Sequence, residues 1–101
     1  MAKVKLEVLL ALAETLGMPE TSEEKIGESG DGATPVRDML VRLATRYPRF
    51  SQTVFDADTR RMTGRVAVFF NGRPLELTDD GLQTGLKDGD TLTFVPLIEG
   101  G

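Results

Sequence analysis

The chain has 101 residues, of which 40% are hydrophobic and 28% charged, a composition typical of one folded domain and not of a disordered protein. Its net charge of -4 disfavours a nucleic acid or an anionic membrane as a partner. It contains no Cys and no His, which excludes disulfides, a thiolate nucleophile, the usual general base near neutral pH and the commonest metal ligand, so we expect no metal site.

The N-terminal stretch has no targeting signal that we can recognise. Met1 to Lys5 lacks a long apolar core followed by a small-residue cleavage site. No apolar run approaches the roughly 20 residues that span a bilayer. We therefore expect a cytoplasmic protein without a membrane partner.

The first predicted element is a half-buried strand. Val4, Leu6, Val8 and Leu10 alternate with mostly charged residues, which is the period of a strand with one apolar face. Its early position and strong pattern favour a central place in a sheet. Residues 11–16 could form a helical turn, which Gly17 would end.

Residues 18–33 are polar, acidic and rich in glycine, and Ile26 is their only β-branched apolar residue. We expect a long surface connection that includes a short strand around Lys25 and Ile26. The acidic residues lack the Asp-x-Asp-x-Asp spacing of a calcium loop.

A helix is predicted after Thr34, which is suited to the N-cap, with Pro35 at the first helical position and Asp38 in the first turn. Pro48 would end it. One continuous apolar stripe follows the spacing of a helix and is expected to lie in the core: Val36, Met39, Leu40, Leu43, Ala44 and Tyr47.

Residues 50–64 are mixed in character. Val54 and Phe55 are expected to pack on the core. Arg60, Arg61 and Arg65 form a basic group, which is more often a solvated turn than a partner contact.

Three more strands are predicted in the last third of the chain. Residues 65–70 form a strong strand, and Asn71-Gly72 is the strongest short hairpin signal because both residues tolerate positive φ. Residues 73–77 would return as an edge strand, since Pro74 cannot donate to a ladder. Residues 91–95 form the last strand.

The residues around this last strand complete the pattern. Leu82 and Leu86 would cover the end of the sheet, and residues 88–90 would make a tight turn before the strand. Leu92 and Phe94 would face the core. Pro96 would then release the chain into a flexible tail of residues 97–101.

The predicted order of elements defines an α+β fold, in which one main helix covers one face of a mixed sheet of four to five strands. If the first and last strands pair centrally, they run parallel, and the arrangement is a β-grasp. We expect a folded domain over residues 1–96 and a tail over residues 97–101 that ends in Gly-Gly.

Three stretches resemble the ubiquitin-like sulfur carriers related to the molybdopterin synthase small subunit (MoaD) and the thiamin-pathway protein ThiS. They are the helix opening at residues 34–40, the strand and Asn-Gly turn at residues 66–72, and residues 86–96 leading to Gly100-Gly101. The acidic 18–33 segment is longer than the minimal family pattern, and Leu97 departs from a frequent second proline.

This resemblance implies a function for the end of the chain. A ubiquitin-activating-like adenylyltransferase would use ATP to adenylate the Gly101 carboxylate, and the acyl-adenylate would take up sulfur as a thiocarboxylate. Gly100 would let the tail enter a narrow channel, because glycine has no Cβ. The chain would then be a carrier without a bound cofactor and not an enzyme.

Strand alternation predicts the surface that meets the partner enzyme. If Val66, Val68 and Phe70 face the helix, then Ala67 and Phe69 lie on the open face of the sheet, with Val95 beside them and Leu9 nearby. Leu97 and Ile98 would guide the tail into the partner. The alternative is that Phe69 packs beneath the 18–33 segment.

The sequence is compatible with three different functions. A sulfur carrier would donate sulfur to an acceptor enzyme in a molybdopterin-type, thiamin-type, cysteine or tRNA thiolation pathway. A protein modifier would join Gly101 to lysines of target proteins. A non-covalent β-grasp interaction module would use neither glycine.

Overall fold

The computed structural model describes residues 2–26 and 31–97. The elements follow one another as β1 (Lys3–Val8), α1 (Leu10–Leu16), β2 (Thr21–Lys25), β3 (Asp31–Pro35), α2 (Val36–Arg46), α3 (Pro48–Thr53), β4 (Phe55–Asp56), β5 (Arg61–Met62), β6 (Val66–Phe70), β7 (Arg73–Pro74), the 3-10 turns η1 (Leu75–Leu77) and η2 (Gly81–Gln83), β8 (Gly85–Lys87) and β9 (Thr91–Pro96). Among these described elements, no helix has the length and apolar character needed to cross a membrane.

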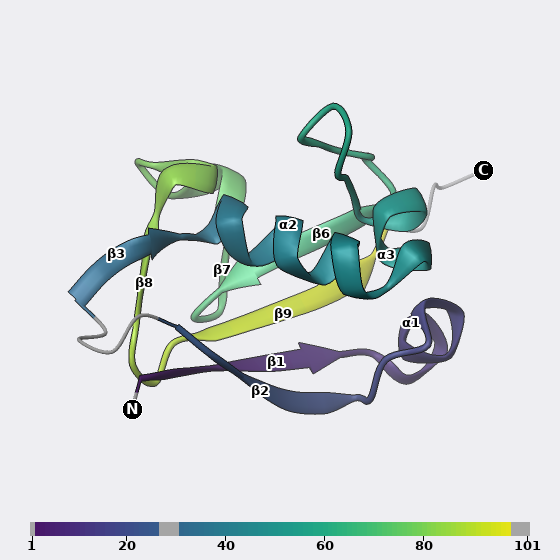
Figure 1. The fold of residues 1–101 in the computed structure, drawn as a ribbon, viewed down its shortest axis with the longest axis horizontal. Helices are drawn as coiled ribbons and strands as arrows, with labels where there is room; N and C mark the ends of the chain where they lie inside the picture. The colour runs from purple at the N-terminus through teal and green to yellow at the C-terminus, as the bar shows by residue number, and fades with distance from the viewer. Residues whose placement is uncertain (1, 27–30, 98–101) are drawn as a thin grey trace.

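The main sheet has five strands in the order β2-β1-β9-β6-β7. Its centre is the predicted parallel pair of first and last strands, in which Leu6 lies opposite Leu92. All other neighbours in this sheet are antiparallel, and the helices α2 and α3 lie across one face (Figure 1). The α+β fold with a β-grasp sheet, predicted from the order of elements, is confirmed.

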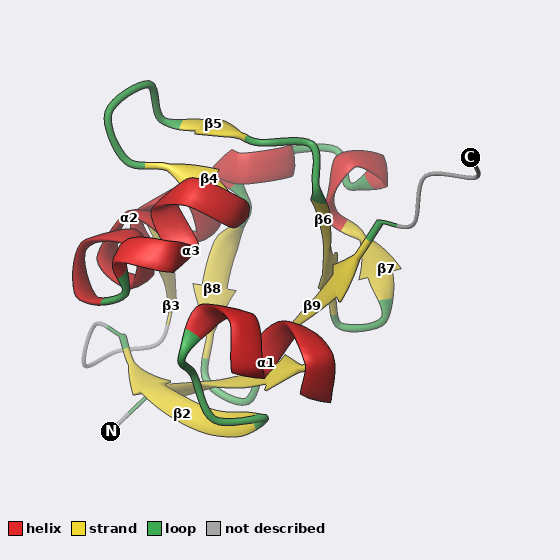
Figure 2. Cartoon of the chain, turned by 90° about the vertical axis from the view of Figure 1, so that its right-hand side faces the viewer, coloured by secondary structure: helices red, strands yellow, loops and turns green. Residues whose placement is uncertain are grey.

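The core lies between α2 and the inner face of the sheet (Figure 2). Every residue of the predicted helical stripe from Val36 to Ala44 is buried, and Tyr47 is half-buried. Opposite them, Leu92 and Phe94 are fully buried, as alternation in the last strand predicts. The Phe94 ring meets the Phe50 ring edge to face, with 5.5 Å between centroids, a favourable arrangement for aromatic pairs.

The start of α2 differs from the prediction. Thr34 does not cap the helix, because it belongs to β3 and lies opposite Leu86 of β8. Pro35 occupies the N-cap position, and the Val36 N–H donates to the Thr84 carbonyl at 2.8 Å. Pairing with β8 thus holds the backbone extended up to Pro35, and the helix begins one residue later than expected.

The acidic stretch after α1 was predicted to be a long surface connection with a short strand around Lys25 and Ile26; a strand is present, but it begins earlier and is longer than expected. Thr21 to Lys25 form β2, which pairs with the outer edge of β1 over its whole length. The strand covers backbone groups of β1 that would otherwise be exposed, although only Ser22 and Glu24 point toward the helix side. Residues 27–30 lie outside the described part of the chain.

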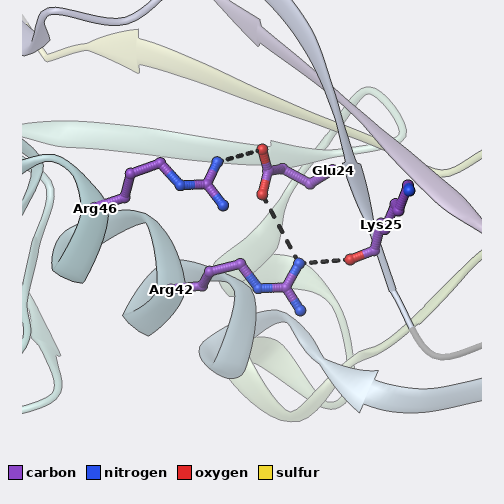
Figure 3. Close-up of polar contacts among 4 residues, drawn as sticks. All are labelled: Glu24, Lys25, Arg42 and Arg46. Carbon is purple, nitrogen blue, oxygen red and sulfur yellow. Dashed lines mark hydrogen bonds and ion pairs between the residues drawn. The ribbon is translucent and has the colours of Figure 1, made fainter.

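An ion-pair cluster fastens β2 to α2 (Figure 3). The Arg46 guanidinium donates to Glu24 at 2.6 Å, and Arg42 lies 3.8 Å from the other oxygen of the same carboxylate. Arg42 also donates to the Lys25 carbonyl. The hydrogen bond to Glu24 raises the pKa of Arg46 further above its ordinary value, so the guanidinium stays charged at any relevant pH.

Pro48 separates two helices. The helix α2 ends at Arg46, as predicted, but α3 begins at Pro48 itself. Proline suits a first helical position because its missing N–H would have no partner there. This second helix was not predicted. It buries Phe50 and leads directly into Val54 and Phe55, which are fully buried as expected.

The turns that bound β6 and β9 adopt the geometry that their sequences predict. Asn71 and Gly72 have φ values of 50° and 86°, and Gly89 has a φ of 88°. The return strand β7 is shorter than the predicted residues 73–77, because the chain turns into η1 directly after Pro74. Leu86 is buried, and Leu82 is half-buried against the core.

Candidate partner-binding face

The face of the sheet turned away from α2 carries the residues predicted to meet a partner. On β6, Val66 and Val68 are buried against the core, so the intervening Ala67 and Phe69 point to the opposite side. On β9, the same alternation turns Val95 outward between the buried Phe94 and the half-buried Pro96. We call this side of the sheet the open face.

The strand register places these outward side chains in rows. Ala67 lies directly opposite Val95, and Phe69 lies opposite Thr93. Leu9 follows Val8, which is opposite Phe94, and its N–H donates to the Phe94 carbonyl at 3.5 Å. Leu9, Val95 and Ala67 therefore form an apolar row across three neighbouring strands.

The polarity of the open face changes along the strands. The next row contains Glu7, Thr93 and Phe69, and the row beyond it contains Lys5 and Thr91. The apolar end is thus the end toward which β9 runs. A partner that binds the apolar end therefore contacts β9 close to the point where the chain leaves the sheet.

The root of the predicted tail is fixed to this apolar end. The Leu97 N–H donates to the Arg65 carbonyl at 2.9 Å, so hydrogen bonding to the β6 segment continues one residue past Pro96. The Leu97 side chain is 52% exposed, and that of Leu9 is 49% exposed. Exposed leucines of this kind are candidate contacts for a partner.

The open face brings together Ala67, Phe69, Val95 and Leu97 of the predicted site. Phe69 is half-buried, since Pro74 of β7 lies directly opposite it and shields part of the ring. Packing of Phe69 beneath the 18–33 segment is wrong, because β2 forms the opposite edge of the sheet, with β1 and β9 in between. The predicted site residues Ile98, Gly100 and Gly101 lie outside the described residues.

The prediction that Leu10 continues the apolar face of the first strand is wrong. The strand β1 ends at Val8, because the chain turns into α1, and Leu10 is 56% exposed at the start of that helix, next to Leu9. The basic group is dispersed: Arg65 adjoins Leu97, whereas Arg60 is in the β4–β5 turn and Arg61 begins β5.

The described residues offer no metal centre. Within residues 2–26 and 31–97, no group of three acidic side chains is placed to hold an ion. This part of the chain presents the apolar end of the open face, and the sequence continues for four residues beyond Leu97.

Comparisons with known proteins identify one matching family and several solved structures with a similar fold. A protein-family model described as the ThiS family matches residues 12–101. The solution structure of small archaeal modifier protein 1 from Methanosarcina acetivorans is 28% identical, with a TM-score of 0.74, over 100% of this chain and 98% of that one. No curated protein sequence matches the chain significantly.

Two further solved structures share the fold. A putative molybdopterin converting factor subunit 1 from Pyrococcus furiosus is 24% identical, with a TM-score of 0.70, over 97% of this chain and 100% of that one. A chain of the Amycolatopsis orientalis BexX/CysO complex is 22% identical, with a TM-score of 0.67, over 97% of this chain and 99% of that one. These similarities place the five-stranded sheet and its covering helix among β-grasp proteins.

Proposed function

Since the chain belongs to the ThiS family, we propose that it is a ubiquitin-like sulfur carrier whose reactive group is the carboxylate of Gly101. Membership confirms the resemblance drawn from the helix opening, the Asn-Gly turn and the last strand. The observation that carries the proposal is that the apolar end of the open face coincides with the root of the tail at Leu97. A partner that binds this face can take the following residues into its active site.

The proposed chemistry has three steps, all on a partner enzyme. A carboxylate is a poor electrophile, so the partner transfers AMP from ATP to the Gly101 carboxylate and releases pyrophosphate. A sulfur nucleophile held by the partner then attacks the acyl-adenylate carbon, and AMP leaves. With a persulfide as that nucleophile the product is an acyl disulfide; a thiol of the partner then attacks its S–S bond, forms a disulfide with the donor sulfur, and releases the terminus as a thiocarboxylate, in which one oxygen has been replaced by sulfur.

Each partner contact has a defined place in this proposal. Phe69, Ala67 and Val95 dock an adenylyltransferase of the ubiquitin-activating type on the open face. Leu97 and Ile98 direct the tail, and the glycines pass through a channel too narrow for side chains. ATP binds to the partner, and this chain contributes no catalytic group and no cofactor. The CysO chain crystallised with BexX supports binding of a second protein by this fold.

A protein modifier is the second candidate function. The observation that favours it is the 28% identity to small archaeal modifier protein 1 over the whole chain. The first step is then the same, but the activated Gly101 passes to a thiol and finally to the ε-amine of a target lysine, giving an isopeptide bond. A non-covalent interaction module is the third candidate, and it needs neither activation nor the glycines.

The mass of the protein purified from its own host distinguishes these functions. A gain of roughly 16 Da, the difference between sulfur and oxygen, identifies the thiocarboxylate of an acyl-transfer intermediate. Lysines carrying a Gly-Gly remnant in digests of high-mass adducts identify the modifier. If neither appears and a variant lacking Gly100 and Gly101 retains full function, the interaction module is correct.

The sulfur acceptor requires a second experiment. We propose an acceptor enzyme of the molybdopterin, thiamin, cysteine or tRNA thiolation type. Protein carrying a chemically prepared terminal thiocarboxylate would be mixed with each class of acceptor, and transfer of sulfur to product would be followed by mass spectrometry. The acceptor that consumes the thiocarboxylate identifies the pathway.

A further inference from the structure

Positive charge is concentrated on the helical side of the sheet. Residues 36–65, which include α2, α3 and the β4–β5 hairpin, contain seven arginines and three aspartates, a net charge of +4. The whole chain has a net charge of -4, so its other residues together carry -8. The charge is therefore strongly polarised, and the basic helices α2 and α3 lie across the face of the sheet opposite the open face (Figure 1).

Three of these arginines lie along the side of the helices that adjoins β2 and α1. Arg42 and Arg46 are four residues apart on α2, so their side chains are neighbours on the helix surface. Arg49 follows in α3. All three residues are exposed. We call Arg42, Arg46 and Arg49 the arginine row.

Contacts with neighbouring elements hold the arginine row in place. Arg42 and Arg46 both donate to β2 (Figure 3), and Arg49 donates to the Thr15 carbonyl of α1 at 3.3 Å. All three of these hydrogen bonds come from Nη1. A guanidinium has five N–H donors, so each arginine has further donors, on Nε and Nη2, that these contacts do not use.

The carboxylates of α2 and of the adjoining side of β2 do not balance the charge of the row. Glu24 is shared between Arg42 and Arg46, and Asp38 lies one turn before Arg42 on α2. Two carboxylates thus lie beside three guanidinium groups. The acceptor of the Arg49 hydrogen bond is a neutral carbonyl, which leaves the positive charge of that side chain uncompensated.

We propose that the arginine row binds an acidic segment of a partner protein, whose Asp or Glu side chains accept hydrogen bonds from the unused guanidinium donors. Arginine suits this role, because its planar fork can bind a carboxylate through two parallel hydrogen bonds. The existing contacts through Nη1 already orient the three side chains. Less conformational entropy is therefore lost on binding than with freely rotating side chains.

A nucleic acid fits this surface less well than an acidic protein segment. Three arginines can neutralise few phosphates, fewer than the roughly 6–10 contacts that give strongly salt-dependent binding to DNA. A longer polyanion would also extend over parts of the chain that together carry -8. A short acidic segment can contact the row without approaching them.

The position of the row gives this interaction a consequence. A protein bound beside α2 and α3 leaves the open face on the other side of the sheet uncovered (Figure 1). Two proteins can therefore bind this chain at the same time, one through the arginine row and one through the open face. The inference concerns recognition and does not depend on the chemistry of Gly101.

The test titrates a peptide of ten glutamates into the whole isotope-labelled protein at physiological salt, and NMR follows the Nε–H signals of the arginines. We expect the signals of the arginine row to shift, while those of Arg60 and Arg61 in the β4–β5 hairpin stay in place. A single-stranded RNA of ten nucleotides, with a similar number of charges, is titrated in the same way. It should bind at least about tenfold more weakly than the peptide.

Removal of the charges supplies a matched control. Replacing all three residues of the arginine row by Gln should weaken peptide binding at least about tenfold, the combined effect of three exposed ion pairs. Arg60→Gln, Arg61→Gln and Arg73→Gln together remove the same charge from other exposed positions. This control should weaken binding less than about threefold, because salt screens distant charges.

The signal shifts in the parent protein locate the bound peptide even if a triple variant does not fold. The proposal is overturned if the peptide shifts no signal of the arginine row, or if both folded triple variants lose binding equally. It is also overturned if the RNA binds as tightly as the peptide, since the row would then recognise phosphates.

Discussion

The side chains of Asn71 and Asp90 join the two turns at one end of the sheet. Asn71 Nδ2 donates to Asp90 Oδ1 at 3.0 Å, while Asn71 Oδ1 accepts the Thr91 N–H at 2.8 Å. The other Asp90 oxygen accepts the Lys87 N–H at 2.7 Å. The hairpin after β6 and the turn before β9 are therefore held in register by one amide and one carboxylate. This register places Ala67 opposite Val95 at the other end of the same strands.

Removing this link should lower stability and leave the fold intact. For Asp90→Ala we expect the free energy of unfolding to fall by about 1–3 kcal/mol, because two hydrogen bonds to one charged group are lost. Urea denaturation followed by circular dichroism measures the change. Asp79→Ala, which removes an exposed carboxylate from the η1–η2 connection, is the matched control. Equal loss in both variants would contradict a specific role for Asp90.

The Asn71–Asp90 link illustrates which features the sequence predicts and which it does not. Asn-Gly and Asp-Gly-Asp each predict a turn, because their backbone requirements are local. That the two turns bind one another depends on β6 and β9 being neighbours, which is a property of the whole sheet. The alternation that identifies Ala67, Phe69 and Val95 as outward residues is local in the same sense, so the open face was predictable.

The features that were mispredicted depend on contacts between distant segments. Residues 21–25 have the composition of a loop, yet they form a strand because the edge of β1 and the arginines of α2 provide partners. Thr34 suits a helix cap, but pairing of β3 with β8 takes it into a strand. Tertiary contacts outweigh local preferences of a few tenths of a kcal/mol per residue at such positions.

The ion pair between α2 and β2 should contribute little to stability in spite of its short distance. Glu24→Ala should reduce the free energy of unfolding by about 0.5–1 kcal/mol, since the two arginine side chains are 40% and 48% exposed, although that of Glu24 is only 11% exposed, and water screens the attraction. Adding 1 M NaCl should abolish most of the difference from the parent protein, because the Debye length then falls to about 3 Å. Glu20→Ala, which removes another carboxylate before β2, serves as control. A loss above 3 kcal/mol would indicate that the cluster behaves as a buried network.

Phenylalanines on the two faces of the sheet should respond in opposite ways to truncation. Phe69→Ala should weaken binding to the activating partner at least about tenfold, the size of a typical interface hot spot, while costing less than about 2 kcal/mol of stability. Phe94→Ala should cost about 3–5 kcal/mol, because that ring is fully buried. Titration calorimetry and thermal unfolding measure the two effects. Normal partner binding by Phe69→Ala would exclude the open face as the docking surface.

A pair of exposed leucines separates docking from general surface hydrophobicity. Leu9→Ala should weaken partner binding about three- to tenfold, since Leu9 ends the apolar row with Val95 and Ala67. Leu77→Ala removes a side chain that is 67% exposed on η1, away from that row, and should leave binding unchanged. Both variants should unfold within about 0.5 kcal/mol of the parent protein. Similar binding losses in the two variants would mean that the partner responds to exposed apolar side chains in general and not to the row formed by Leu9, Val95 and Ala67.

Removal of Gly100 and Gly101 should separate recognition from chemistry. The shortened chain keeps the open face and Leu97, so its affinity for the activating partner should fall only modestly, within about fivefold. Its unfolding transition should be unchanged, because the pairing of β6 with β9 and the Leu97 hydrogen bond are retained. Formation of the acyl-adenylate, measured as pyrophosphate release, should be lost, because the chain then ends at Glu99, whose side chain does not fit a channel that admits only glycine. Extending the chain with one Ala after Gly101 provides a matched control that keeps both glycines but moves the carboxylate by one residue, or about 3.5 Å when extended. Since acyl transfer tolerates little misplacement of the reacting atoms, this variant should also bind normally and react at least about 100-fold more slowly. Full pyrophosphate release by either variant would show that the terminal carboxylate of Gly101 is not the group that the partner activates.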